Sequence, residues 1–203
     1  MTAQFTDRFS EAFKYAAQEH RCQLRKDTSI PYISHLMSVS ALVWENGGDE
    51  DQAIAGLLHD VVEDADPPSA VPRIRQDILE KFGPRVLALV EDCTDGEQDA
   101  NGQKAPWRER KATYLANLRH KPKELLLVSC CDKLHNARAI LTDLITYGES
   151  FFNRFTGKKD GTLWYYRELC NIYQEKLPDV VAVRELANVV DAIEKLCSKN
   201  SNE

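Results

Sequence analysis

The sequence lacks an excess of positive charge, since 26 lysines and arginines face 32 aspartates and glutamates, for a formal net charge of −6. A general nucleic-acid binder needs a basic face, so this class of protein is excluded. A local basic pocket for an anionic small molecule remains compatible with the charge. The sequence also lacks an apolar run close to the roughly twenty residues that span a bilayer, so we expect no membrane partner.

Cysteine pairs of the CxxC type are absent, although the 203 residues include six cysteines. No signal-peptide pattern precedes them, so we expect reduced, mostly buried thiols in a cytoplasmic protein. The six are Cys22, Cys93, Cys130, Cys131, Cys170 and Cys197. The chain length suits one domain with a sizeable core.

Strand patterns and internal repeats are missing as well, and apolar residues recur instead at helical spacing. The spacing predicts a helix after Asp49 that carries 53–64, and eight others. These others are 4–22, 33–46, 73–82, 84–92, 107–119, 123–146, 162–177 and 179–197. Residues 93–106 give the longest loop pattern. We therefore expect an all-α, single-domain helical bundle over 1–199, with 200–203 as a disordered tail.

An apolar run ends in a charged cluster at residues 53–64, AIAGLLHDVVED. Positions three and four apart share a helix face, which would place His59 above Glu63 and Asp60 above Asp64. One interpretation is a helix end with solvated charges. The alternative is that an acidic cluster beside a buried histidine binds a cation or a proton. A metal ion held there needs further ligands from elsewhere in the chain.

Three other residues are candidates for the same site: His20, His35 and Asp132. Asp132 stands in an otherwise apolar helix, where an unpaired carboxylate is costly to bury. A lone histidine or aspartate on an apolar face is more often a satisfied core residue. Taken as a set, one histidine, the His59-Asp60 pair and Asp132 offer two nitrogens and two oxygens. Such a mixed set suits Mn²⁺ and suits Ca²⁺ less well, with zinc still open.

Three sequence blocks occur in a fixed order: QLRKDTSIPYISH, LLHDVVED and DKLHNAR. Their H…HD…D pattern resembles that of the HD superfamily of metal-dependent phosphohydrolases. Together the blocks resemble the signatures of the (p)ppGpp hydrolase domain of RelA/SpoT proteins, over roughly residues 10–145. The chain is too short for the synthetase and regulatory domains of the long family members. The resemblance therefore implies an HD-domain bundle and a stand-alone small alarmone hydrolase.

The resemblance implies one Mn²⁺ ion held by four protein ligands. These ligands are His35, His59, Asp60 and Asp132. It also implies that Glu63 and Asp64 orient or activate the attacking water. Arg25 and Lys26 match the basic pair on the family's nucleotide-binding loop. Asn136 matches an asparagine that faces the ribose and phosphates.

Further substrate contacts are less strongly indicated. His20 matches a family histidine, which we expect to support the ligands without binding the metal. Arg138, like Lys133, is a candidate to hold an anion. Tyr165 and Tyr166 point about a hundred degrees apart on a helix, so one can face the site while the other faces the core. We predict that Tyr166 is the one that contacts the ribose or a phosphate. Packing of both rings in the core is the alternative.

The expected activity is Mn²⁺-dependent hydrolysis of the 3′-pyrophosphate of (p)ppGpp, or of the adenine analogue, with release of pyrophosphate. A divalent metal polarises a phosphoryl oxygen and acidifies bound water, and a nearby carboxylate can accept the proton. One alternative is another nucleotide phosphatase on the same site, for example one that removes the 2′-phosphate of NADPH. The other is a non-catalytic alarmone-binding regulator. The expected partner is a small nucleotide, and the sequence allows a homodimer.

Overall fold

The computed structural model describes residues 5–94 and 105–199. Most of the loop predicted at 93–106, and all of the tail predicted at 200–203, lie outside these residues. The described residues are largely helical and form no strand, with one isolated bridge between Leu24 and Pro31. The all-α prediction is confirmed. No helix in this described part has the length and apolar character needed to cross a membrane.

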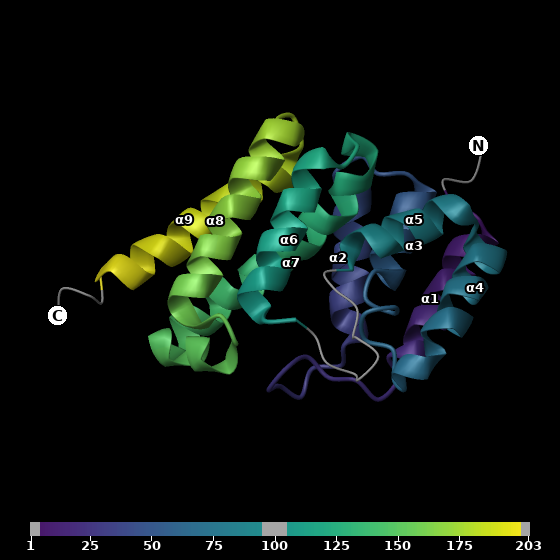
Figure 1. Cartoon of the computed structure of the whole chain (residues 1–203), viewed down its shortest axis with the longest axis horizontal. Helices are drawn as coiled ribbons and strands as arrows, with labels where there is room; N and C mark the ends of the chain where they lie inside the picture. Colours follow the sequence, from purple (N-terminus) through teal and green to yellow (C-terminus); the bar gives the residue numbers. More distant parts are fainter. Residues whose placement is uncertain (1–4, 95–104, 200–203) are drawn as a thin grey trace. The chain divides into compact units, whose positions relative to one another are not determined.

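The helices follow the predicted order, with ends that shift by a few residues (Figure 1). They are α1 (Asp7–Glu19), α2 (Ile33–Glu45), α3 (Glu50–Leu58), α4 (Val71–Phe82), α5 (Pro84–Cys93), α6 (Trp107–His120), α7 (Lys123–Tyr147), α8 (Lys158–Lys176) and α9 (Val181–Lys199). Two short 3₁₀ helices, η1 (Pro68–Ala70) and η2 (Glu149–Arg154), join longer elements. Proline lies in the first turn of α4 and of α5, where its missing N–H costs no helical hydrogen bond.

Helix α3 is shorter than predicted, because it ends at Leu58 and residues 59–64 form consecutive turns. The ring of His59 explains part of this ending. Its Nδ1 lies 2.9 Å from the carbonyl oxygen of Gly56, the acceptor that a continued helix would offer to the amide of Asp60. The amide of Asp64 still donates to the carbonyl of Asp60 at 2.9 Å, so these two residues stay one turn apart, as predicted.

The chain divides into two compact units. The first comprises Met1–Lys104 and Leu127–Cys131, and the second comprises Ala105–Leu126 and Asp132–Glu203. Helix α7 therefore contributes five residues to the first unit and the rest to the second. The single domain predicted over 1–199 stays a prediction.

In the first unit, α3 is the central helix, packed against α1, α2 and α5. All of its residues from Gln52 to Leu58 are buried. Gly56 allows α2 and α3 to approach closely, because a Cβ at this position would lie 2.9 Å from Cα of Ser40. The hydroxyl of Ser40 donates to the carbonyl of Ala53 at 2.8 Å across the same contact. The two helices are thus held at a fixed, short separation.

The buried face of α1 consists of Ala12, Tyr15 and Ala16, and α1 packs against α3. Phe13 on the same helix is 40% exposed, and Phe5, which precedes the helix, is 55% exposed. Small side chains allow a close helix approach, and this favours the alanines over the phenylalanines at the contact.

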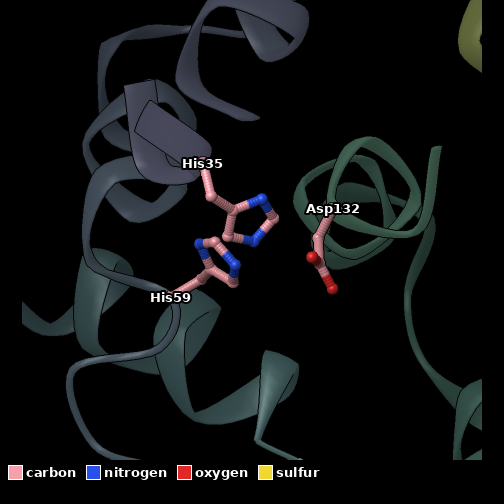
Figure 2. Close-up of side chains that lie close together, drawn as sticks. All are labelled: His35, His59 and Asp132. Carbon is pink, nitrogen blue, oxygen red and sulfur yellow. The ribbon is translucent and has the colours of Figure 1, made fainter. Parts of the chain in front are cut away.

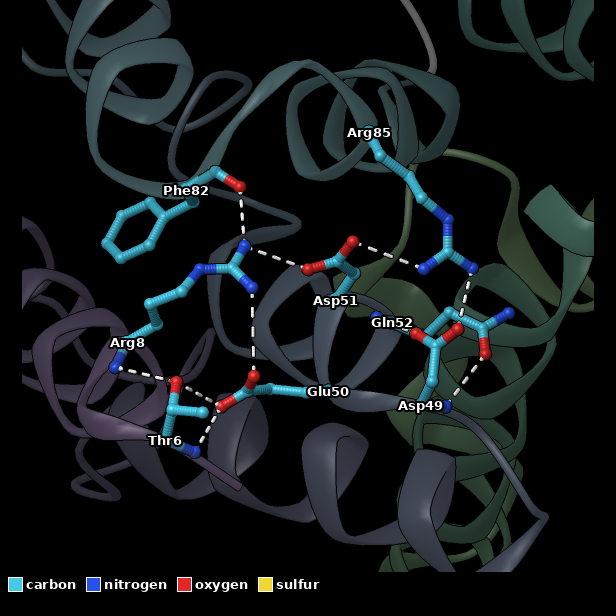
Figure 3. A network of polar contacts seen from close by, with 8 residues as sticks. All are labelled: Thr6, Arg8, Asp49, Glu50, Asp51, Gln52, Phe82 and Arg85. Carbon is cyan, nitrogen blue, oxygen red and sulfur yellow. Dashed lines mark hydrogen bonds and ion pairs between the residues drawn. The ribbon is translucent and has the colours of Figure 1, made fainter. Parts of the chain in front are cut away.

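The start of α3 is held by ion pairs and hydrogen bonds from two other helices, α1 and α5 (Figure 3). Arg8 of α1 donates to Asp51 at 2.8 Å and to the carbonyl of Phe82, at the end of α4, at 2.6 Å. Arg85 of α5 donates to Asp49 at 2.7 Å and to Asp51 at 3.2 Å. Burial raises the pKa of Asp49, but the hydrogen bond and positive charge of Arg85, together with hydrogen bonds from the amides of Gln52 and Asp51, outweigh this, so the pKa lies below its ordinary value. The network fixes the helix that leads to His59.

In the second unit, α8 packs against α9 and α6, and Figure 1 shows α8 and α9 side by side. Trp107 closes the start of α6 onto the start of α8. A Cβ added at Gly157 or Gly161 would lie 2.6 or 3.0 Å from the Trp107 ring, so glycine is required where this ring packs. Five of the six cysteines are buried and only Cys22 is exposed, which agrees with the expectation of mostly buried thiols.

Candidate metal centre

His35 lies in the first turn of α2 and has no exposed surface. The loop at 23–32 ends directly before α2, and the amide of His35 donates to the carbonyl of Tyr32 at 2.9 Å. Its ring lies edge-on to that of His59, with centroids 5.1 Å apart at 70°. The short separation of α2 and α3 therefore brings two buried imidazoles together.

His59 is 1% exposed and directly follows α3. A carbonyl oxygen can only accept, so the contact with Gly56 places the proton of a neutral ring on Nδ1. The lone pair then lies on Nε2, the nitrogen that faces the other site residues. Such an outer hydrogen bond is the usual way in which a protein orients a metal-binding histidine.

Asp60 approaches both imidazoles. Its Oδ2 atom lies 3.0 Å from Nε2 of His59 and 3.6 Å from Nε2 of His35. The same oxygen accepts a hydrogen bond of 2.6 Å from the hydroxyl of Tyr32. A carboxylate oxygen and a nitrogen lone pair are both acceptors, so a cation is needed at this contact. Either a proton or a metal ion would satisfy it.

Asp132 completes the cluster from α7 and is 4% exposed. It follows directly on Cys131, the last residue that α7 contributes to the first unit. One potential ligand atom from each of His35, His59 and Asp132 lies within 4.8 Å of the other two (Figure 2). Two imidazoles and a carboxylate at this spacing could bind a divalent metal ion. The cluster thus consists of residues that are far apart in the sequence.

Two donors hold the carboxylate of Asp132. Lys133 donates to Oδ2 and Asn136 donates to Oδ1, each at 2.6 Å. Burial lowers the pKa of Lys133, but the charge of Asp132 and the electrostatic influence of Tyr165, Tyr114 and Tyr173 together outweigh this, so the pKa lies well above its usual value. Lys133 therefore stays charged, and its ammonium group also lies 5.5 Å from the ring centre of Tyr114. Asn136 was predicted to face the substrate, and here it orients a candidate ligand.

Glu63 and Asp64 lie in the turns that follow His59, with Glu63 half-buried and Asp64 exposed. The amide nitrogen of Gln23 donates to Oδ2 of Asp64 at 2.8 Å. The other atom of that amide, Oε1, lies 2.5 Å from Nδ1 of His20. His20 thus reaches the acidic residues through Gln23, and its predicted supporting role gains a physical route.

Arg25 and Lys26 lie on the loop between α1 and α2, where Arg25 is half-buried and Lys26 is exposed. The guanidinium carbon of Arg25 lies 5.6 Å from the ring centre of Tyr32, whose hydroxyl binds Asp60. This places the guanidinium group next to a side chain that contacts the cluster. The nucleotide-binding role of the pair stays a prediction.

Two predicted substrate contacts have other partners or surroundings in the structure. Arg138 is exposed and donates to Glu185 of α9 at 2.8 Å. It is six residues beyond Asp132, so it points about a third of a turn away from Asp132 around α7. Tyr166 is 8% exposed and Tyr165 is 4% exposed. Both rings are therefore buried, and a role for Tyr166 at the substrate stays a prediction.

Sequence reasoning missed three residues that contact the predicted site: Gln23, Tyr32 and Gly56. Gln23 and Tyr32 stand inside the block QLRKDTSIPYISH, so their positions carried a signal although their contacts did not. Gly56 stands three residues before His59, where its carbonyl is within reach of the ring. None of the three belongs to the H…HD…D pattern, and only the folded contacts reveal them.

We predict that Gly56→Ala weakens metal binding as well as stability. The added methyl group would press on the backbone of Ser40 and force α3 away from α2, and thus His59 away from His35. Overpacking of this kind costs about 1–3 kcal/mol. Mn²⁺ titration of the nucleotide-free protein should show a dissociation constant raised by about tenfold, as for other losses of support around a ligand.

Gly161→Ala is the matched control, because its methyl group would press on Trp107 in the second unit. It should lower the melting temperature and leave Mn²⁺ affinity unchanged. An unaltered Mn²⁺ dissociation constant in Gly56→Ala would show that the separation of α2 and α3 does not control the site.

Comparison with known proteins gives the same assignment as the cluster. The sequence profile of the HD domain family matches residues 12–147. The guanosine-3′,5′-bis(diphosphate) 3′-pyrophosphohydrolase MESH1 of Drosophila melanogaster is 37% identical over 134 residues, which cover 64% of this chain and 68% of that protein. The human protein of the same name is 35% identical over 131 residues, covering 63% and 66%. The GTP pyrophosphokinase rsh of Brucella melitensis is 34% identical over 132 residues, which make up 16% of its length.

Two solved structures are also similar. A metazoan SpoT ortholog, described as hydrolysing ppGpp and acting in starvation responses, superposes with a TM-score of 0.71 at 27% identity, over 93% of this chain and 96% of that one. A Listeria monocytogenes EGD-e protein superposes with a TM-score of 0.66 at 28% identity, over 82% and 99%. The matched family profile covers more than half of the chain and includes every residue of the cluster. The chain therefore belongs to the HD domain family.

Proposed function

We propose that this protein is a metal-dependent 3′-pyrophosphohydrolase of guanosine alarmones of the (p)ppGpp type. The observation that carries the proposal is the convergence of His35, His59 and Asp132, with Asp60 only 3.0 Å from His59. The relatives named for this reaction, at 35–37% identity, support the choice of substrate. The adenosine alarmone is a second substrate of the same chemistry.

The metal ion we propose is Mn²⁺, held by the two histidines and by the carboxylates of Asp60 and Asp132. The donor set of two imidazoles and two carboxylates suits a mid-hard divalent ion. The proton on Nδ1 of His59 leaves the lone pair of Nε2 for the metal. When bound, the ion would polarise a phosphoryl oxygen and lower the pKa of a bound water.

The protein's own groups supply the remaining chemistry. Water adds across the bond between the ribose 3′-oxygen and the adjacent phosphorus, which gives a free 3′-hydroxyl and pyrophosphate. Glu63 or Asp64 accepts the proton that the attacking water loses. Lys133 and Asn136 hold Asp132 in place. Arg25 and Lys26 offset the negative charge of the phosphates, which the acidic cluster would otherwise repel.

Product analysis tests the proposed function. The full chain is incubated with ppGpp, ppApp or NADPH in the presence of Mn²⁺, and products are separated by anion exchange. We expect GDP and pyrophosphate from ppGpp, and loss of the reaction when a chelator removes the metal. Phosphate release from NADPH without pyrophosphate release from ppGpp would overturn the proposal in favour of a nucleotide 2′-phosphatase. Binding of ppGpp without turnover would indicate a regulator.

The proposed setting is the cytoplasm, with a small nucleotide as partner. The burial of five of the six cysteines supports a reducing compartment, where such thiols persist. The net charge of −6 supports a small-molecule partner over nucleic acid.

We predict that Arg25→Ala mainly raises KM for the nucleotide. The guanidinium group is the half-buried cation of the loop that leads to His35, so its loss removes charge-assisted contacts to phosphate. The expected rise is about tenfold, or roughly 1.4 kcal/mol. Metal content should not change, because arginine is not a ligand.

Lys14→Ala serves as the control, since Lys14 is an exposed cation on α1 outside the matched blocks. Its steady-state constants should equal those of the wild type. Equal KM values for the two variants would show that the loop is only a solvated surface and that the anion is held elsewhere. The next candidates are then Lys133, Arg138 and the basic segment 154–159.

A further inference from the structure

The loop between α1 and α2 is a small hairpin that begins at Gln23 and ends at Tyr32. The amide of Tyr32 donates to the carbonyl of Gln23 at 3.0 Å, and the amide of Arg25 donates to the carbonyl of Ile30 at 2.8 Å. Asp27 takes a left-handed conformation, with φ of 56°, where the chain reverses. Gln23 and Tyr32 therefore face each other at the base of one closed element.

Gln23 and Tyr32, the two residues that close the hairpin, contact different carboxylates of the candidate site. Gln23 binds Oδ2 of Asp64 at 2.8 Å, and Tyr32 binds Oδ2 of Asp60 at 2.6 Å. Asp64 belongs to the pair proposed to accept the proton, and Asp60 is a proposed ligand. A single backbone element thus reaches both functional carboxylates.

The amide of Gln23 can adopt only one orientation in these contacts. Its Nε2 must face Asp64, because a carboxylate accepts and an amide oxygen there would be repelled. Its Oε1 then faces Nδ1 of His20, which must carry the proton. His20 is 4% exposed, so a buried ring anchors the amide. The chain of donors runs in one direction, from His20 through Gln23 to Asp64.

Tyr32 is anchored in a comparable way. Its ring stacks on that of His20, with centroids 5.1 Å apart and planes at 23°. It also meets the ring of His35 edge-on at 5.6 Å. These contacts leave the phenol little freedom, so the hydroxyl is aimed at Asp60 before any ligand binds. His20 thus supports both arms of the hairpin: the first arm, Gln23, through a hydrogen bond, and the second arm, Tyr32, through stacking.

Resting on the proposed function, we propose that Gln23 and Tyr32 are positioning residues for the reaction. Gln23 sets the direction of the Asp64 carboxylate, and Tyr32 sets the direction of the Asp60 carboxylate. Misplacing a catalytic group by about 1 Å can cost up to about 10²-fold in rate. Removing an outer partner of a metal ligand costs about 10–100-fold in metal affinity. The two residues should therefore act on different measured quantities.

Gln23→Met tests the first arm, because methionine keeps the length of the side chain and removes both hydrogen bonds. We expect kcat for pyrophosphate release from ppGpp to fall by about tenfold, with KM and Mn²⁺ affinity within about twofold of wild type. A residue that merely holds the hairpin would act through Arg25 and raise KM instead. Unchanged kcat, or a rise in KM alone, would overturn this arm.

Gln76→Met is the matched control, since the amide of Gln76 donates to Glu80 at 2.6 Å on the exposed face of α4. This variant loses the same type of bond, and kcat should not change. A similar fall of kcat in both variants would also overturn the assignment of Gln23.

Tyr32→Phe tests the second arm by a measurement that needs no activity. The Mn²⁺ dissociation constant of the nucleotide-free protein should rise by about tenfold or more when the hydroxyl is lost. Tyr147→Phe, which removes a hydroxyl from a side chain that is 58% exposed, should leave it unchanged. Wild-type Mn²⁺ affinity in Tyr32→Phe would overturn this arm. If the wild-type protein does not cleave ppGpp, the proposed function fails, and this titration still judges the role of Tyr32.

Discussion

Asp132→Ala is expected to abolish both metal binding and turnover. The carboxylate is 4% exposed and is the element of the cluster that α7 supplies. Its removal would leave two imidazoles and Asp60, and would leave the ammonium group of Lys133 without the carboxylate it binds at 2.6 Å. Even outer partners of metal ligands are worth about 10–100-fold, so loss of a ligand should cost more than about 10²-fold in Mn²⁺ affinity. Elemental analysis and titration measure this directly.

His59→Ala should behave in the same way, because Nε2 of His59 lies 3.0 Å from Oδ2 of Asp60, closer than Nε2 of His35 at 3.6 Å. His120→Ala is the control, since His120 is exposed on α6. It should keep full metal content and full activity. A stoichiometric metal ion in purified Asp132→Ala would show that this residue is not a ligand.

Glu63→Gln is expected to separate chemistry from binding. Glutamine keeps the size of the side chain but cannot accept a proton from water. The fall in kcat should be about 10²-fold or more, the range typical for loss of a general base, with metal content retained. Glu63 is half-buried and lies four residues after His59, within the turns that begin at His59. Single-turnover hydrolysis of ppGpp at saturating Mn²⁺ isolates the chemical step.

Glu45→Gln is a suitable control, because Glu45 is an exposed residue at the end of α2. Near-normal turnover in Glu63→Gln would remove Glu63 from the mechanism. Asp64, whose carboxylate is oriented by Gln23, would then be the proton acceptor. In that case, the fall of kcat expected for Gln23→Met would be the supporting evidence for Asp64, because Gln23 acts on this carboxylate.

The position of α3 affects the candidate metal site, although no proposed ligand lies within this helix. His59 follows its last residue, so any shift of α3 moves the ring. Arg8 and Arg85 hold the opposite end of the helix, through Asp51 and Asp49 (Figure 3). Such partly exposed ion pairs contribute little each, about 0–1 kcal/mol. Their value here lies in fixing the direction of a helix that ends at the cluster.

The sequence by itself determined the class of fold and the identity of the candidate ligands. Helical spacing of apolar residues is a local property, so it predicted nearly every helix in order. The H…HD…D pattern can likewise be recognised in the sequence alone, because metal chemistry restricts which residue types can act as ligands. The expectation that the chain neither spans a membrane nor binds nucleic acids in general rests on composition, because both classes require a residue bias that is visible in the sequence.

Only the tertiary structure decided where the helix before His59 ends and which outer residues orient the site. Periodicity predicted a continuous helix through residues 53–64, but the ring of His59 competes for the carbonyl of Gly56. It also could not assign Arg138, which pairs with Glu185 far along the chain. Contacts such as Gln23 with Asp64 join residues 41 apart in sequence. Such contacts depend on how α1 and α3 pack. The hairpin and α2 separate these two helices in the chain, and no local sequence pattern encodes packing over that distance.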